Sequence, residues 1–436
     1  MGETAKGRGF LQRAVPNFSL VRENRSFRRL FVAALGSGIG TWFATVALQI
    51  DVFARTQSTT WVGALLIANL LPTVLVGFLL GSLVDRLERR RLLIGADVVR
   101  AAVFFAMPFV GSATGLVVLA LVAGFATAFF RPAVLAGLPN TVGDADLAQA
   151  NGLLQSADFL TTAIGPILGA VLVAATGPGT AYAVNGVSFL FSAVLLFGVP
   201  RRLLQSEQSL SRGHLADMRE GLAAVVRSPA LLTVLITFTI VMVPAAFLNV
   251  AEIALAKVSL NAGSVGFGLL WTASGIGLVV GSTVASRVMA RLGVRATYPL
   301  AIAVFGVGMA ASGAAPSIWV AYPTMVVCGL GNGVLVVSNI TLVQNGAPDR
   351  VRGRVFTTII SLNFVVSALA MAGAGPLTST LGARWTYEIG AAVMAVAAVT
   401  GLLLASRIPP APLEPPVDPA LDPELAEVEA LTAPAV

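Results

Sequence analysis

Long apolar runs follow one another along the whole chain and are separated by short polar stretches. They lie near residues 30–54, 61–83, 92–111, 115–138, 152–176, 180–199, 231–256, 265–286, 297–315, 318–345, 355–381 and 385–405. A helix that crosses a bilayer needs ~20 mostly apolar residues. A buried helix of a soluble protein would explain one such run but not a dozen in series. The pattern predicts an all-α, polytopic membrane protein with twelve transmembrane helices.

The distribution of charge predicts which side of the membrane each loop occupies. Charged residues make up 11% of the chain, against ~25% in soluble domains. The net charge of +7 does not indicate nucleic-acid binding, because the arginines gather in alternate loops. The intervening loops hold only Arg55, Lys257 and Arg384. By the positive-inside rule, both termini are expected in the cytoplasm and the chain in the cell (inner) membrane.

Sequence echoes between the two halves predict a repeat. Gly81 begins GSLVD and Gly281 begins GSTVA, 200 residues later, and Asp51 is echoed by Glu252 after 201 residues. We therefore expect two pseudo-symmetric six-helix bundles. The expected parts are a cytoplasmic tail 1–29, a bundle 30–200, a cytoplasmic central loop 201–230, a bundle 231–406 and a disordered cytoplasmic tail 407–436. Within the loop, 209–227 is predicted to be a short amphipathic helix.

Several kinds of chemistry have no residues to support them. Neither lysine, Lys6 or Lys257, lies in a phosphate-binding P-loop, so no nucleotide site is expected. Cys328 and His214 are the single residues of their types, which excludes an internal disulfide and a Cys/His metal cluster. No catalytic cluster of carboxylates or histidines is evident. We expect neither a cofactor nor a bound metal, and no enzyme activity.

The loop between the second and third runs, residues 81–91, reads Gly-Ser-Leu-Val-Asp-Arg-Leu-Glu-Arg-Arg-Arg. It resembles the cytoplasmic loop motif of the major facilitator superfamily, although Glu88 stands where the family usually has glycine. The resemblance implies a two-bundle transporter fold and a latch that holds the cytoplasmic side closed. The matching residues are Gly81, Asp85, Arg86, Arg89 and Arg90. An arginine-rich loop that merely sets topology is the alternative.

Two further motifs are similar to a bacterial exporter branch that includes macrolide efflux proteins and the enterobactin exporter. One is a Gly-Pro helix motif, Gly165, Pro166 and Gly169, echoed by Gly375 and Pro376. The other is the Arg-Gly-Arg loop Arg352, Gly353 and Arg354, for which the resemblance implies a second latch and contact with lipid headgroups. Ordinary helix packing is the alternative for the first motif. The span-four arginine of classical drug–proton antiporters is missing from residues 119–126.

Charged residues inside the predicted spans are candidates for function, because a charge at a helix centre costs ~2.5 kcal/mol or more. Asp51 and Glu252 are predicted to form an acidic pair at the outer vestibule for protons or cationic substrates. Two interfacial carboxylates that reach water are the alternative. Asp158 is the third candidate for the proton. Asp97 and Arg100 share a helix face at i,i+3 and are predicted to be a structural pair.

Polar and aromatic residues of four spans complete the predicted site. Thr41, Thr45 and Gln49 form a polar stripe on span one at i+4 spacing. The family resemblance implies that spans one, four, seven and ten line a central cavity, to which Asn249, Asn332, Phe125 and Phe129 would contribute. Interhelical hydrogen bonding is the alternative for the stripe.

An apolar, aromatic cavity with few charges favours an exporter of hydrophobic or amphipathic small molecules, such as drugs, antibiotics or siderophores, working by alternating access and coupled to protons. The alternatives are an importer of a small metabolite with the same fold and a membrane-embedded lipid-modifying enzyme. The expected partners are the small-molecule substrate, protons and membrane lipids, with no nucleic acid or nucleotide.

Overall fold

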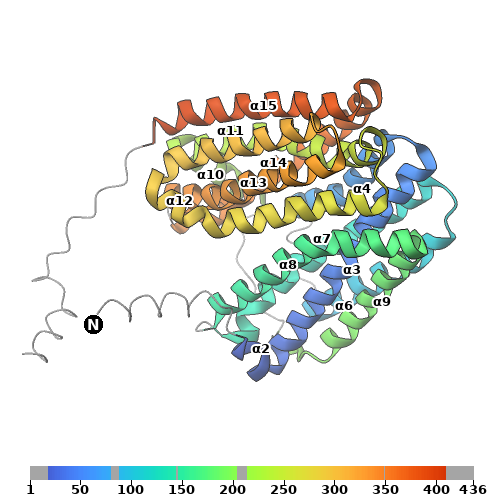
Figure 1. The fold of residues 1–436 in the computed structure, drawn as a ribbon. Coiled ribbons are helices and arrows are strands. Elements are labelled where there is room, and N and C mark those ends of the chain that lie inside the picture. The colour runs from blue at the N-terminus through green and yellow to red at the C-terminus, as the bar shows by residue number, and fades with distance from the viewer. Residues whose placement is uncertain (1–17, 80–87, 144–145, 204–213, 348, 409–436) are drawn as a thin grey trace, which may run out of the picture.

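The computed structural model describes residues 18–79, 88–143, 146–203, 214–347 and 349–408, and over these ranges the chain is helical without a strand (Figure 1). The first half comprises α2 (Ser19–Glu23), α3 (Arg25–Thr56), α4 (Thr59–Leu79), α6 (Arg89–Ala106), the 3-10 turn η1 (Met107–Phe109), α7 (Ala113–Val142), α8 (Leu147–Thr176), α9 (Pro178–Phe197) and the 3-10 turn η2 (Arg201–Leu203). The second half comprises α10 (His214–Arg227), α11 (Pro229–Ala254), the π-helical turn η3 (Leu255–Ser259), α12 (Ser264–Gly313), α13 (Ile318–Gly346), α14 (Asp349–Leu381) and α15 (Ala383–Ala405).

The described helices supply twelve membrane spans. Eleven continuous helices are long and apolar enough to cross a bilayer. One of them, α12, is two spans joined at Gly293, whose φ of 74° and ψ of 154° are not helical. Glycine adopts a positive φ without the steric penalty that a Cβ brings. The prediction of an all-α fold with twelve spans is therefore confirmed.

The helix that contains the first predicted span begins before the apolar run. The side chain of Asn24 accepts hydrogen bonds from the backbone N–H groups of Ser26 and Phe27, both at 3.0 Å. This N-cap satisfies donors that have no partner inside the helix. Helix α3 consequently starts at Arg25, before the apolar run that begins near residue 30. The extra turn carries Arg25, Arg28 and Arg29. We call the end of the molecule on which this turn lies the arginine-rich end.

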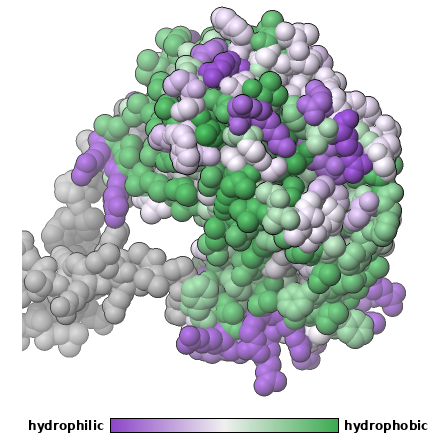
Figure 2. All heavy atoms as spheres, turned by 45° about the vertical axis from the view of Figure 1, so that its right-hand side comes forward, coloured by the Kyte–Doolittle hydropathy of each residue, from purple (hydrophilic) through white to green (hydrophobic). Residues whose placement is uncertain are grey.

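The helices form two six-helix bundles that meet along two seams. Helix α8 packs along α12, and α4 packs along α14. The seams close in the half of the molecule away from the arginine-rich end, where Thr59 donates to the carbonyl of Gly375 at 2.9 Å. In Figure 1 the bundles converge at the right and separate toward the left, where α15 ends. Figure 2 shows a hollow between the two bundles on this side, so the passage between them opens toward the arginine-rich end.

Glycines bring α12 and α13 into backbone contact inside the second bundle. A Cβ added at Gly329 would overlap the carbonyl oxygen of Ser274, and one at Gly333 would overlap that of Leu278. Gly277 and Gly281 of α12 face the carbonyls of α13 in the same way. Small residues allow such close approach, and the van der Waals contact they permit holds helices together in lipid. The outer surface is broadly hydrophobic, as a bilayer requires (Figure 2).

Candidate functional site

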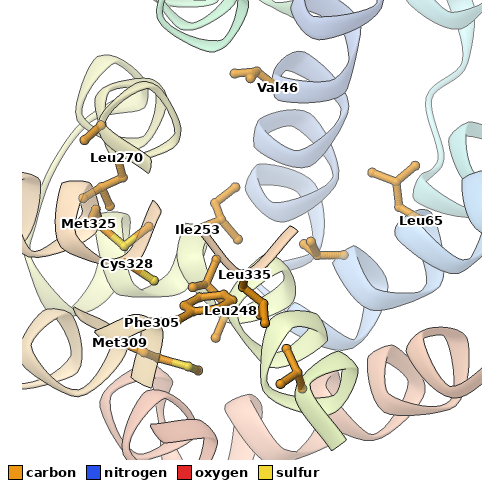
Figure 3. Close-up of a cluster of buried hydrophobic side chains, with 14 of the residues drawn as sticks. Val46, Leu65, Leu248, Ile253, Leu270, Phe305, Met309, Met325, Cys328 and Leu335 are labelled. Carbon is orange, nitrogen blue, oxygen red and sulfur yellow. The ribbon is translucent and has the colours of Figure 1, made fainter. Parts of the chain in front are cut away.

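A cavity of about 140 Å³ lies where the two bundles meet. Its wall combines Thr162 of α8, from the first bundle, with residues of α11, α12 and α13 from the second. The wall residues from the second bundle are Ala245, Leu248, Asn249, Glu252, Trp271, Ser274, Gly275, Leu278, Phe305 and Asn332. Figure 3 shows two of these residues, Leu248 and Phe305, close together in a cluster of buried hydrophobic side chains, with Leu335 beside them. The cavity is thus apolar in the main and carries a small number of polar groups, as ligand sites do.

Glu252 is the charged residue of this wall. Its side chain is 1% exposed, and its Oε1 has no hydrogen-bond partner among the described residues. Cys328 of α13 and Tyr387 of α15 lie within its electrostatic reach. A buried ionised carboxylate without a partner is unfavourable, so such a group takes up a proton or a cationic ligand. Glu252 is therefore a candidate for binding a proton or a cation.

Two other polar groups of the wall each have an unused donor or acceptor atom in the described structure. Asn249 uses its Nδ2 to donate to the carbonyl of Ala245 at 2.9 Å, which leaves Oδ1 as an acceptor. The indole Nε1 of Trp271 has no partner in the described structure. The ring of Trp271 contacts that of Trp42 on α3, with centroids 5.4 Å apart. This aromatic contact joins the two bundles at the edge of the cavity.

Asp51, the repeat partner of Glu252, has quite different surroundings. It forms a two-bond ion pair with Arg55 at 2.7 and 2.8 Å, and Tyr182 donates its hydroxyl to Oδ2 at 2.9 Å. Arg55 also donates to the carbonyl of Val110 at 2.6 Å. Asp51 thus ties α3 to α9 and to the loop after η1, and it does not line the cavity. The i+4 spacing of Asp51 and Arg55 was a sign of this pair in the sequence.

Asp97 and Arg100 form an ion pair inside the first bundle. Both side chains are buried, and the guanidinium carbon lies 4.2 Å from the ring centroids of Phe130 and Phe189. Two aromatic faces and a carboxylate together compensate for the buried positive charge. The pair lies away from Glu252 and holds α6, α7 and α9 together.

Some of the remaining polar candidates bond to the backbone of their own helix, and others have no such bond. Thr41 and Thr45 donate to carbonyls one turn earlier, at 2.7 and 2.8 Å. Gln49 is fully buried, and neither of its amide atoms has a partner among the described residues. Asp158 has an exposed side chain one turn before Thr162, so it shares the face of α8 that reaches the cavity.

Phe125 and Phe129 do not join the cavity at Glu252. They line a separate groove of about 340 Å³ between α6 and α7, with Arg91, Leu92, Gly95, Ala96, Val99, Val122 and Ala126. The aromatic residues of the cavity wall are instead Trp271 and Phe305, which were not among the predicted site residues. Trp271 lies four residues before Gly275, so the two residues share one helix face. This spacing was the feature of the sequence that could have placed Trp271 in the cavity wall.

Part of the predicted latch, Gly81, Asp85 and Arg86, lies outside the described residues, as does the side chain of Arg352. Arg90 donates to the carbonyl of Phe197, and its guanidinium lies 4.7 Å above the ring of that residue. Arg354 forms an ion pair with Glu220 of α10. The predicted amphipathic helix in the central loop is α10, and it packs against α14.

The Gly-Pro motifs lie at close helix contacts. A Cβ at Gly165 would come 2.8 Å from Cγ of Trp42, and one at Gly169 would come 2.8 Å from Cα of Phe43. Gly375 faces the backbone of Thr60 across the seam between the bundles, where an added Cβ would lie 2.6 Å from Cα. The first motif therefore packs α8 on α3, and its echo packs α14 on α4.

The model of one transporter family, described as transmembrane secretion effector, matches residues 17–428. The chain belongs to this family, within the efflux branch of the major facilitator superfamily. The chain is a membrane transporter, not an enzyme, and the predicted resemblance is confirmed.

Relatives of this transporter agree with that assignment. It is 26% identical over 382 residues to the uncharacterized MFS-type transporter YfiS of Bacillus subtilis, covering 85% of this chain and 91% of the relative. It is 28% identical over 386 residues to the multidrug efflux pump Tap of Mycolicibacterium fortuitum, covering 82% and 90%. The structure of the nucleoside transporter NupG superposes with a TM-score of 0.73 at 13% identity, covering 87% of this chain and 100% of that one.

Proposed function

We propose that this transporter exports hydrophobic or amphipathic small molecules by alternating access, driven by protons. The observation that carries the proposal is the cavity at Glu252, whose walls come from both bundles. The described conformation holds the seams together on one side, and the hollow between the bundles lies toward the arginine-rich end (Figure 2). Gly268 and Gly275 of α12 face the carbonyls of Pro166 and Thr162 of α8 across one seam. A rocking motion of the bundles that broke these contacts would expose the same cavity to the other side.

The efflux relatives support the direction of transport. Tap is named a multidrug efflux pump, and a protein from Streptococcus pyogenes that is 25% identical over 217 residues is named macrolide efflux protein A. Proton coupling is supported by Glu252, because a buried acid that is alternately exposed to the two sides of a membrane can pick up a proton on one and release it on the other. The Gly81–Asp85–Arg86 motif would stabilise the state in which the arginine-rich end is closed.

The first test concerns orientation. Cys328 is the single native thiol and is buried, so its replacement gives a cysteine-free background. Single cysteines at Ser112 and Asn261, which are exposed at the end away from the arginines, should react in intact cells with a membrane-impermeant maleimide. A cysteine at Ser406, exposed at the arginine-rich end, should not. Reaction of Ser406→Cys from outside would reverse the orientation of the whole molecule.

The second test concerns energy and direction. Inverted membrane vesicles that contain the protein should accumulate an amphipathic fluorescent drug when their interior is acidified, and a protonophore should abolish the accumulation. Vesicles from cells without the protein are the control for partition of the drug into lipid. Accumulation that ignores the protonophore would refute proton coupling, and accumulation in right-side-out vesicles alone would make the protein an importer.

A further inference from the structure

We propose that the groove between α6 and α7 is a binding site for one anionic phospholipid, with an acyl chain along the groove and the phosphate at its mouth, the end at Arg91. The lipid belongs to the leaflet on the arginine-rich side of the membrane. The site is separate from the cavity at Glu252, and its occupation does not depend on the direction or the energy source of transport.

The groove lies on the outer face of the first bundle. Helix α6 packs against α7 and α9 of its own bundle, whereas the second bundle meets the first along α4 and α8. Asp97 and Arg100 lie on the buried face of α6, while Gly95 and Val99 lie on its exposed face. On the opposite wall, Val122 of α7 is 40% exposed. Apolar side chains that are exposed on the outside of a membrane bundle contact acyl chains.

The dimensions of the groove match one acyl chain in one leaflet. Along α6 the groove runs from Arg91 to Val99, a rise of ~12 Å at ~1.5 Å per residue. Half of the hydrocarbon core of a bilayer is ~15 Å. The volume of about 340 Å³ has room for about eleven groups of the size of a water molecule at ~30 Å³ each, and a methylene group has a similar size.

The lining is apolar along its length and charged at one end. Gly95 and Ala96 of α6 are small, and an added Cβ at Gly95 would have nothing within 4 Å. Phe125 and Phe129 lie on the side of α7. Among the described residues of the lining, Arg91 is the charged one. Because the surrounding lipid is as apolar as this lining, the chain by itself gives little preference. The preference must come from the headgroup at Arg91.

The mouth of the groove has an excess of positive charge. Helix α6 begins with three arginines and η2 carries two more, namely Arg89, Arg90, Arg91, Arg201 and Arg202. Glu88 is shared by Arg91 at 2.7 Å and Arg201 at 3.4 Å, and these two arginine side chains remain 74% and 60% exposed. One carboxylate cannot neutralise two guanidinium groups. Basic groups at this level of the bilayer attract anionic headgroups, whereas the phosphate of a zwitterionic lipid is already balanced by its own amine.

The binding experiment uses the purified full-length transporter, freed of lipid in detergent, and two probes with the same chains, dioleoylphosphatidylglycerol and dioleoylphosphatidylcholine. Native mass spectrometry counts the lipids that remain bound during each titration. We expect the first phosphatidylglycerol to bind at least ~5-fold more tightly, because an arginine near the membrane surface contributes ~1 kcal/mol toward an anionic lipid. Equal affinity for the two lipids would overturn the inference.

Variants separate the headgroup from the chain. Arg91→Gln should lower the preference for phosphatidylglycerol ~5-fold and leave the binding of phosphatidylcholine unchanged. Gly95→Leu should fill the groove and weaken the binding of both lipids, and it should fold because its Cβ meets nothing within 4 Å. Two controls should bind as the wild type does: Arg25→Gln, an exposed arginine of α3 at the same end, and Gly373→Leu, an exposed glycine of α14 with the same clearance. Wild-type binding by Gly95→Leu would place the lipid elsewhere and overturn the inference.

Photocrosslinking locates the bound chain without a variant. A phosphatidylglycerol with a diazirine in the middle of one acyl chain, illuminated with the wild-type transporter in nanodiscs, should label peptides that contain residues 91–99 and 122–129. Unlabelled phosphatidylglycerol should compete with this label at least ~5-fold better than phosphatidylcholine. Label spread over all outward-facing helices, with equal competition by both lipids, would mean annular lipid only and would overturn the inference. None of these measurements requires transport, so their failure leaves the export proposal standing.

Discussion

Gly329→Val is expected to prevent the second bundle from assembling. The added side chain would meet the backbone of α12 at Ser274 and Leu278, where no flexible side chain can yield. Overpacking of an adaptable core costs ~1–3 kcal/mol, and a clash between two helix backbones should exceed that range. We expect nearly complete loss of monodisperse protein, measured by size-exclusion chromatography of detergent extracts, and a marked fall in the thermal unfolding midpoint of what remains.

A matched glycine provides the control. Gly373 lies inside α14, is exposed, and has nothing within 4 Å of the position that a Cβ would take. Gly373→Val makes the same change in helix propensity without the clash, so its yield should stay near that of the wild type. Wild-type yield from Gly329→Val would mean that α12 and α13 are not in contact as described.

Glu252→Gln is expected to abolish uphill transport while leaving the protein folded. Glutamine keeps the size of the side chain but cannot exchange a proton, so the drug should only equilibrate across inverted vesicles. Proton movement that accompanies the drug, followed with a pH-sensitive dye inside the vesicles, should disappear as well. Retention of wild-type accumulation would place the proton site elsewhere, with Asp158 the next residue to test.

Asp51→Asn is the contrasting variant, because the sequence relates the two acids by the repeat and the structure separates them. Loss of the Asp51 charge weakens the hydrogen bonds from Arg55 and Tyr182, at a cost of about 1–3 kcal/mol. We expect a lower unfolding midpoint with uphill transport retained. Uncoupling by Asp51→Asn would restore the symmetric acidic pair that the sequence predicted.

The membrane spans could be predicted from the sequence because each one depends only on the residues of its own segment. A helix that crosses lipid must satisfy its own backbone and present apolar side chains, so each span appears as one run of the required length. The start of helix α3 was not visible in the apolar pattern, since the cap formed by Asn24 lies outside the apolar run. The apolar pattern also predicts a break between the runs 265–286 and 297–315. The structure has this break at Gly293, where one helix continues directly into the next.

The site was harder to predict, because residues that line it come from four helices. Glu252, Asn249 and Asn332 were selected as polar residues in apolar runs, and the structure places all three in one cavity wall. Trp271 and Phe305 were missed because an aromatic residue in an apolar run looks the same whether it faces lipid, a neighbour or a cavity. Phe125 and Phe129 were selected and face a different groove for that same reason.

Hydropathy therefore predicts the number of spans, and the placement of arginines predicts the topology. Both depend on whether a segment lies in water or in lipid, which is a property of that segment alone. The internal echoes predict the two-bundle fold. The fate of each acid depends on which helices lie opposite it. Tyr182 comes to Asp51 across 131 residues of chain, while nothing cationic among the described residues comes to Glu252. Helix packing decides that Asp51 is held in a structural ion pair and that Glu252 has no cationic partner among the described residues.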